Sequence, residues 1–138
     1  MFKSYSYDEL QIGQKDSISK TITEEVIKAF ADVSEDRNPI HLDEEFAKNS
    51  MFKERIAHGM ITAGLISAAI GTKLPGVNTI YLKQNLEFTA PVKIGDTITA
   101  EVEVLEKLEK KNVRLSTIAR NQRGEIVVKG EALVKKPV

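Results

Sequence analysis

The amino-acid sequence predicts an α+β fold in which a curved antiparallel sheet wraps around one central helix. The second half of the chain alternates apolar and polar residues between short turns, which indicates consecutive antiparallel strands with one solvated face. Residues 58–72 are apolar nearly all round and rich in Gly and Ala, a pattern typical of a buried helix. Because the apolar face of such a sheet has to be covered, we expect this helix to cover it. A length of 138 residues fits a single domain spanning residues 1–138.

Two shorter elements are expected before the central helix. Residues 10–20 have room for one short strand. A helix follows, capped by Thr21 or Thr23 and ending near Ser34, with two acidic residues favourably placed in its first turn. Five residues at helical spacing predict its apolar face: Val26, Ile27, Phe30, Ala31 and Val33.

The segment 35–56 is polar and irregular, and we expect only one helical turn in it, near residues 43–48. A loop this long inside a small domain is usually functional. Beyond the central helix, Pro75 and Gly76 mark its end, and turns are predicted at residues 91–96 and 121–124. The alternating pattern places strands within four segments: 80–88, 98–104, 113–119 and 128–134.

Composition excludes several classes of function. Lys and Arg together number 20, as do Asp and Glu, so the formal net charge of zero gives no basic stripe for nucleic acid and no charged arm for a membrane surface. The absence of cysteine excludes disulfides, thiolate catalysis and thiolate metal sites. We see no apolar signal-peptide core and no segment long enough to span a bilayer, and therefore expect a cytoplasmic protein.

The candidate chemistry lies in a loop that joins Asp36, Asn38 and His41, with Pro39 to stiffen the backbone. Imidazole titrates near neutral pH, so His41 is a natural general base or acid, and Asp36 could share a water molecule with it. Asn38 could orient either side chain. Two alternatives stay open: an Asx turn at Asp36 with His41 merely packed, and a metal site of Asp36, His41 and Asp43, which lacks a third well-spaced histidine.

A second candidate site lies at the start of the central helix, in the run His58-Gly59-Met60. Free backbone N–H groups at a helix N-terminus attract negative charge, and Gly59 has no side chain to block a substrate carbonyl that becomes an enolate. Ser67 lies about two turns further along the helix, where its hydroxyl could bond within the site. The structural alternatives are close packing at Gly59 and Ser67 and a satisfied, partly buried histidine at His58.

These motifs resemble the MaoC-like (R)-specific enoyl-CoA hydratase family. The resemblance rests on the Asp-x-Asn-Pro-x-His core with His-Gly-Met downstream, and it extends over most of the chain. The length is similar to that of the short bacterial hydratases that supply polyhydroxyalkanoate synthesis. One position departs from the pattern, because many members carry Gly where this chain has Glu35.

The resemblance implies the hot-dog fold, a long helix wrapped by an antiparallel sheet, and a homodimer with the acyl tunnel near its interface. It also implies reversible hydration of trans-2-enoyl-CoA to (R)-3-hydroxyacyl-CoA, with no cofactor and no metal. By position, Asp36 and His41 would be the catalytic pair, Asn38 a supporting residue and the Gly59 N–H the oxyanion donor, while Ser67 would shape the site.

Three rival functions remain on the sequence alone. A thioesterase usually has a carboxylate on the central helix, whereas residues 60–70 contain no Asp or Glu. A dehydratase acting on acyl-carrier-protein thioesters would use the same pair, and a basic face including Lys53 and Arg55 would serve either phosphate-bearing carrier. A non-catalytic thioester-binding protein would keep the fold without the chemistry.

Overall fold

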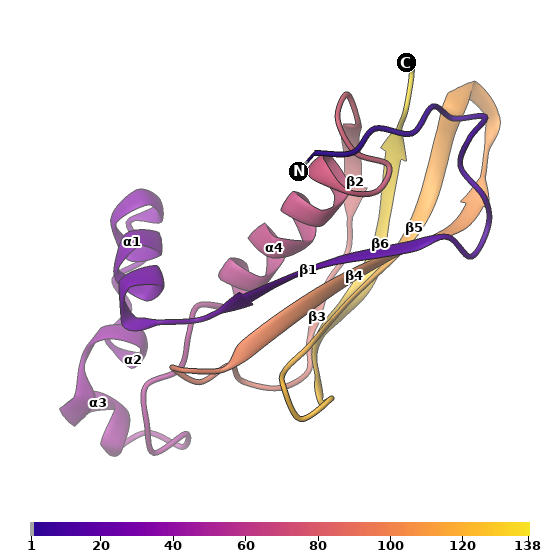
Figure 1. Ribbon diagram of the computed structural model, residues 1–138. Helices are drawn as coiled ribbons and strands as arrows, with labels where there is room; N and C mark the ends of the chain where they lie inside the picture. Colours follow the sequence, from indigo (N-terminus) through magenta and orange to yellow (C-terminus); the bar gives the residue numbers. More distant parts are fainter. Residues whose placement is uncertain (1) are drawn as a thin grey trace.

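The computed structural model of the protein describes residues 2–138 and shows a six-stranded antiparallel sheet curved around one long helix, α4 (Figure 1). The strand order is β1-β4-β5-β6-β2, with the short β3 also paired to β6. The strands are β1 Lys15–Thr21, β2 Ile80–Gln84, β3 Glu87–Phe88, β4 Thr97–Lys107, β5 Asn112–Arg120 and β6 Ile126–Lys135. The predicted α+β architecture is therefore confirmed.

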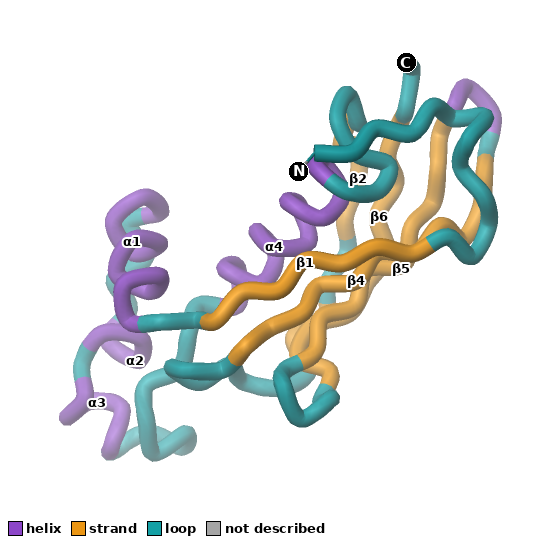
Figure 2. The backbone as a smooth tube through the Cα atoms, in the orientation of Figure 1, coloured by secondary structure: helices purple, strands orange, loops and turns teal. Residues whose placement is uncertain are grey.

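The central strands of the sheet have one buried and one solvated face, as their sequence alternation predicts. Burial alternates residue by residue along β4 and β5, so that Val102 and Val104 of β4 lie in the core beside Val113 and Leu115 of β5. These strands pair in register, with Val104 opposite Leu115. The tube view in Figure 2 shows α4 running alongside the long strands, within the curve of the sheet.

Helix α4 runs from Gly59 to Thr72 and packs one side on the sheet. Five apolar residues of this side belong to the core: Ile61, Leu65, Ile66, Ala69 and Ile70. Met60, Gly64 and Ser67 lie on the exposed side, so the expectation of burial all round is wrong for the single chain. The sheet covers only one side of the helix, and no other element among residues 2–138 covers the opposite side.

Among the helices described within residues 2–138, none combines the length and the hydrophobicity of a transmembrane span.

Helix α1, Glu24–Ser34, begins where the sequence predicts, because the Thr23 hydroxyl accepts a hydrogen bond from the Val26 N–H. Its buried residues are Ile27 and Ala31. Val33, which was expected on the apolar face, is 82% exposed. The helix projects beyond the end of the sheet (Figure 1), so only a narrow stripe of it meets other elements.

The segment after α1 contains one helix more than expected. The predicted turn near residues 43–48 is α3, Glu44–Lys48, with Asp43 as its cap. The additional helix is α2, Pro39–Leu42. It forms because the Asn38 side chain accepts from the Ile40 N–H and proline stands at the first helical position, where its missing N–H costs nothing. A 3-10 turn, Glu109–Lys111, joins β4 to β5.

The segment 80–88 forms two strands instead of one. A bulge lies between Tyr81 and Lys83 of β2, and the chain then leaves the ladder before β3. Ile80, Leu82 and Phe88 are each about half exposed, so the apolar alternation does not mark a face buried within the chain. The reason is position: β2 is the last strand of the sheet, with an unpaired edge.

We expect the core between α4 and the sheet to dominate stability. Ile66 on α4 is fully buried, so Ile66→Ala should lower the free energy of unfolding by about 2–5 kcal/mol through lost burial and a residual cavity. The control Val33→Ala, at an exposed position, should change it by less than about 0.5 kcal/mol. Urea unfolding followed by circular dichroism would measure both, and equal values for the two variants would contradict this description of the core.

Candidate active site

Asp36 is held in a tight turn between α1 and α2. Its N–H donates to the Ser34 hydroxyl at 3.1 Å, and its Oδ1 accepts from the Asn38 N–H at 3.3 Å. The side chain therefore makes the Asx-type turn that the structural alternative required, yet it is exposed and retains acceptor capacity. Glu35 has a φ of 65°, in the left-handed region that glycine adopts most readily. The glycine that the family resemblance led us to expect here would suit the same turn, and Glu35 adopts it with its side chain in solvent.

His41 is presented by α2 and is only 8% exposed. Its Nδ1–H donates to the Ile56 carbonyl at 2.7 Å, since a carbonyl can only accept, and this fixes the tautomer with a lone pair on Nε2. Burial lowers the pKa of His41, and the neighbouring His58 lowers it further, against the opposing effects of the Ile56 hydrogen bond and the Asp36 charge. The side chain is therefore ready to accept a proton on Nε2 at neutral pH.

His58 connects the two members of the predicted pair. Its ring stacks on the His41 ring with centroids 3.9 Å apart and contacts the Phe30 ring at 4.8 Å. Its Nε2–H donates to the Asp36 main-chain carbonyl at 2.8 Å. The other nitrogen, Nδ1, is buried with no hydrogen-bond partner among residues 2–138. We expected both ring nitrogens of His58 to have hydrogen-bond partners, but only Nε2 has one.

Asp36, His41 and His58 are the one set of possible metal ligands that we find within residues 2–138, with ligand atoms within 4.8 Å of one another. Stacked rings direct their lone pairs along nearly parallel planes, here tilted by 29°. A metal in line with the lone pair of one ring would lie far out of the plane of the other, so the two imidazoles are poorly placed to share an ion. Asp43, the third ligand considered from the sequence, instead caps α3 through a hydrogen bond from the Phe46 N–H.

The N-terminus of α4 presents free N–H groups beside this pair. His58 occupies the cap position but its side chain makes no capping hydrogen bond, so the first-turn donors, including the Gly59 N–H, have no side-chain acceptor. A Cβ at Gly59 would lie 2.8 Å from two atoms of the Phe88 ring. The Phe88 ring lies so close to the backbone here that only glycine fits without a shift. A substrate oxygen that approached the Gly59 N–H closely would need the same absence of a side chain.

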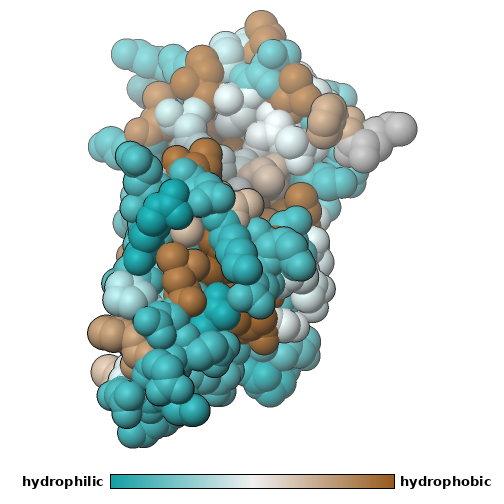
Figure 3. Space-filling model, turned by 90° about the vertical axis from the view of Figure 1, so that its left-hand side faces the viewer, coloured by the Kyte–Doolittle hydropathy of each residue, from teal (hydrophilic) through white to brown (hydrophobic). Residues whose placement is uncertain are grey.

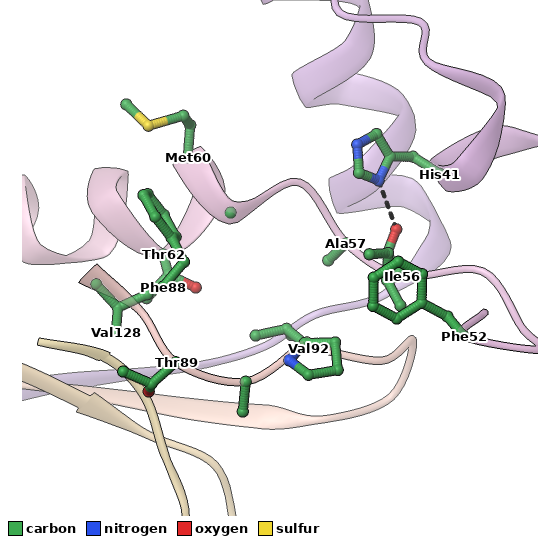
Figure 4. A pocket seen from close by; sticks show the side chains of 13 residues that line it. His41, Phe52, Ile56, Ala57, Met60, Thr62, Phe88, Thr89, Val92 and Val128 are labelled. Atoms are coloured by element: carbon green, nitrogen blue, oxygen red, sulfur yellow. Dashed lines mark hydrogen bonds between the residues drawn. The ribbon is translucent and has the colours of Figure 1, made fainter. Parts of the chain in front are cut away.

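A cavity of about 530 Å³ opens along these groups, with His41 and Gly59 on its wall (Figure 4). In Figure 4 the ring of His41 faces the cavity above Ile56, with Phe52 and Phe88 on opposite sides. The remaining wall is mainly apolar and includes Ala57, Met60, Val92 and Val128. An apolar cavity with a few polar groups at one end suits a chain-like substrate that carries a reactive polar head.

The structure brings together three of the five predicted site residues. Asp36 lies beside His41, and Gly59 lies on the same cavity wall as His41. Asn38 caps α2 and so orients His41 through the backbone. Ser67 lies on the exposed side of α4, about 12 Å along the helix axis from Gly59 and outside the wall of this cavity.

Sequence reasoning missed two contacts and misplaced a third residue. Phe88 was expected in a strand and among the residues of the family resemblance, but its contact with Gly59 was not predicted. His58 was singled out, but its hydrogen bond to the Asp36 carbonyl was not predicted. Arg55, assigned to a basic face, is 6% exposed and bonded to Glu24 and Glu44, so that assignment is wrong. The one feature of the sequence that could have indicated a role for Arg55 is its place three residues before His58.

We expect the His41 imidazole to titrate below the usual histidine pKa of about 6.5. A lowered pKa means that the folded state binds fewer protons than the unfolded state, so the stability due to neutral His41 should be lost as pH falls below about 6.5. Proton NMR of the two histidines, assigned with His41→Gln, would measure the midpoint. A midpoint at or above the usual value would contradict the burial argument.

The sequence and the fold both match known proteins. The model of the MaoC like domain family matches residues 9–125. The chain is 48% identical over 132 residues to an (R)-specific enoyl-CoA hydratase from Rhodospirillum rubrum, and the match covers 95% of this chain and 91% of that protein.

Two solved structures have the same hot-dog fold. The unliganded R-hydratase from Pseudomonas aeruginosa superposes with a TM-score of 0.92 at 55% identity, covering 96% of this chain and 85% of that one. The (R)-hydratase from Aeromonas caviae, which is involved in polyhydroxyalkanoate (PHA) biosynthesis, gives 0.89 at 46% identity, covering 93% and 98%. The chain therefore belongs to the MaoC-like domain family, close to the (R)-specific hydratases of PHA biosynthesis.

Proposed function

We infer that this chain is an (R)-specific enoyl-CoA hydratase, which adds water reversibly to trans-2-enoyl-CoA and forms (R)-3-hydroxyacyl-CoA. The observation that carries this conclusion is near full-length identity of 46–48% to hydratases of that specificity. The site fits the reaction: a carboxylate and an imidazole lie together, and an uncapped helix N-terminus shares an apolar cavity with the imidazole.

In the proposed mechanism the thioester oxygen accepts a hydrogen bond from the Gly59 N–H at the N-terminus of α4. A water molecule bound between Asp36 and His41 attacks C3 as one of the pair takes its proton. The electrons of the C2–C3 double bond move toward the thioester carbonyl, and the helix end stabilises the resulting enolate oxygen. C2 then takes a proton from the pair on the same face, which gives syn addition. The Nε2 lone pair of neutral His41 supports this residue as an acceptor of the water proton.

The proposal includes a homodimer. Two apolar surfaces are left uncovered by the single chain: the outer side of α4, with Met60, and the edge strand β2, with Ile80 and Leu82. A space-filling view from the side of α1 shows several hydrophobic patches between hydrophilic residues on that face (Figure 3). Pairing two β2 edges would continue the sheet and remove an exposed edge. It would also give Ser67, on the outer side of α4, a neighbour from the second copy. A cytoplasmic location belongs to the same proposal and is based on the cysteine-free sequence.

Crotonyl-CoA is the substrate with which we would test the reaction. Wild-type protein should consume the conjugated enoyl thioester, followed by its absorbance, and produce (R)-3-hydroxybutyryl-CoA. Asp36→Asn and His41→Gln should each lower kcat by about 10²–10⁴-fold, because each removes a proton acceptor while leaving the fold intact. Full activity in both variants would contradict the catalytic pair.

The same assay should compare the two possible carriers of the acyl group. Turnover of crotonyl and longer enoyl groups is measured on CoA and on acyl carrier protein. Preference for the CoA thioesters would support a hydratase, and preference for the carrier-protein thioesters a dehydratase. Binding of all these thioesters without turnover would support a non-catalytic protein instead.

Gly59→Ala should lower kcat/KM by about tenfold or more. The added methyl group would meet the Phe88 ring at 2.8 Å and occupy the approach to the N–H that we assign to the oxyanion. Gly71→Ala is the matched control, because it lies on the same helix and a Cβ there would have no neighbour within 4 Å in the chain. Equal activities of the two variants would argue against the role of Gly59.

A further inference from the structure

We propose that Arg55 is a positioning residue for the reaction, which holds the main chain of His41 so that its imidazole keeps one orientation and one tautomer. The Arg55 side chain is 6% exposed, and Arg55 is not among the residues that line the cavity. Its Nε–H donates to the His41 carbonyl at 2.8 Å. Arg55 therefore acts on the backbone of His41 and does not need to touch substrate.

The neighbouring residue completes the grip on His41. The Ile56 carbonyl accepts the His41 Nδ1–H at 2.7 Å, and the Ile56 N–H donates to the Ile40 carbonyl at 3.3 Å. Two consecutive residues, Arg55 and Ile56, thus fix the backbone before His41, the backbone after it, and its ring. Since Ile56 holds the ring and Arg55 holds the peptide, both have to stay in register for Nε2 to face the cavity.

The segment that carries Arg55 is itself fixed to the sheet. The Ala57 N–H donates to the Val92 carbonyl at 2.7 Å, and Ile56 forms an isolated antiparallel bridge with Lys93. The turn that enters β4 therefore determines where residues 55–57 lie, and these residues determine where His41 lies. No other side chain among residues 2–138 donates a hydrogen bond to the His41 carbonyl.

The charges around Arg55 favour a functional explanation over a purely stabilising one. Nη1 bonds Glu24 of α1 at 3.0 Å and Glu44 of α3 at 3.4 Å, but both carboxylates are largely in solvent. Nη2 is buried without a partner. A buried cation with an unsatisfied donor is a poor stabiliser, and an apolar residue of the same volume often does as well or better. Its hydrogen bond to the catalytic loop is what an apolar residue would lack.

Substitution of Arg55 by glutamine or by methionine isolates that hydrogen bond, because these two side chains are similar in size and both lack the positive charge. The side-chain nitrogen of glutamine occupies the place of the arginine Nε, whereas methionine has no donor there. We expect Arg55→Gln to keep kcat within about threefold of wild type and Arg55→Met to lower it tenfold or more, with KM changed by less than threefold in both. Arg114→Met, which removes ion pairs to Glu106 and Glu131 on the sheet, is the control and should keep wild-type kcat. Equal loss in the Gln and Met variants would overturn the proposal.

Folding and positioning are separated by a third variant. Arg55→Lys keeps a cation near Glu24 and Glu44 but not the planar Nε donor, so it should fold like wild type and still lose tenfold in kcat. Wild-type kcat in this variant would also overturn the proposal, even if Arg55→Met fails to fold.

Nitrogen-15 NMR of the His41 ring gives a readout independent of turnover, which matters because the kinetic argument rests on the proposed hydratase activity. Wild type and Arg55→Gln should show the single Nδ1–H tautomer, and Arg55→Lys a mixture of tautomers. An unchanged tautomer in Arg55→Lys would overturn the positioning role. The tautomer shift in a protein inactive on every thioester would refute the hydratase function and leave the role of Arg55 supported.

Discussion

The packing of one helix against one curved sheet is the constraint on which the site depends. The buried residues of α4 and the inward valines of β4 and β5 can only be covered by each other. Once that contact forms, the first residues of the helix, His58 and Gly59, are fixed at the open end of the sheet. The donors at the helix N-terminus and the ring that stacks on His41 therefore take their positions from the core, not from the loop.

Hydrogen bonds hold the loop that supplies Asp36 and His41 in place, whereas burial of apolar side chains holds the core. Three carbonyl groups receive the key donors: that of Asp36 from His58, that of His41 from Arg55, and that of Ile56 from His41. Each donor side chain is nearly buried, so water competes little for these hydrogen bonds. A polar, irregular segment is thereby held to the accuracy that proton transfer needs without a hydrophobic core of its own.

Much of the fold could be predicted from the sequence because alternation and small-residue runs report directly on burial. The extent of α4 was predicted this way, whereas the cap, given as Thr21 or Thr23, and the turns were predicted from residue types typical of those positions. Val33 and the residues of β2 were misjudged because an apolar side chain does not by itself reveal whether another element of the chain covers it. Asp36 and His41 were predicted from residue chemistry and family resemblance, and the structure brings them together. The contacts of Arg55 and Phe88 were not predicted, because contacts between segments far apart in sequence leave no local pattern.

The arrangement in Figure 1 has a consequence for how the protein loses activity. Helices α1, α2 and α3 project from the end of the sheet. They are joined to the rest of the chain by Ile27 of α1, which reaches the core, and by hydrogen bonds around residues 55–58. We expect such a unit to open locally at a lower free energy than the core, with its amides exchanging with solvent before those of β4 or β5. We therefore expect the arrangement of Asp36 and His41 to be lost in mild denaturant before the sheet and α4 unfold.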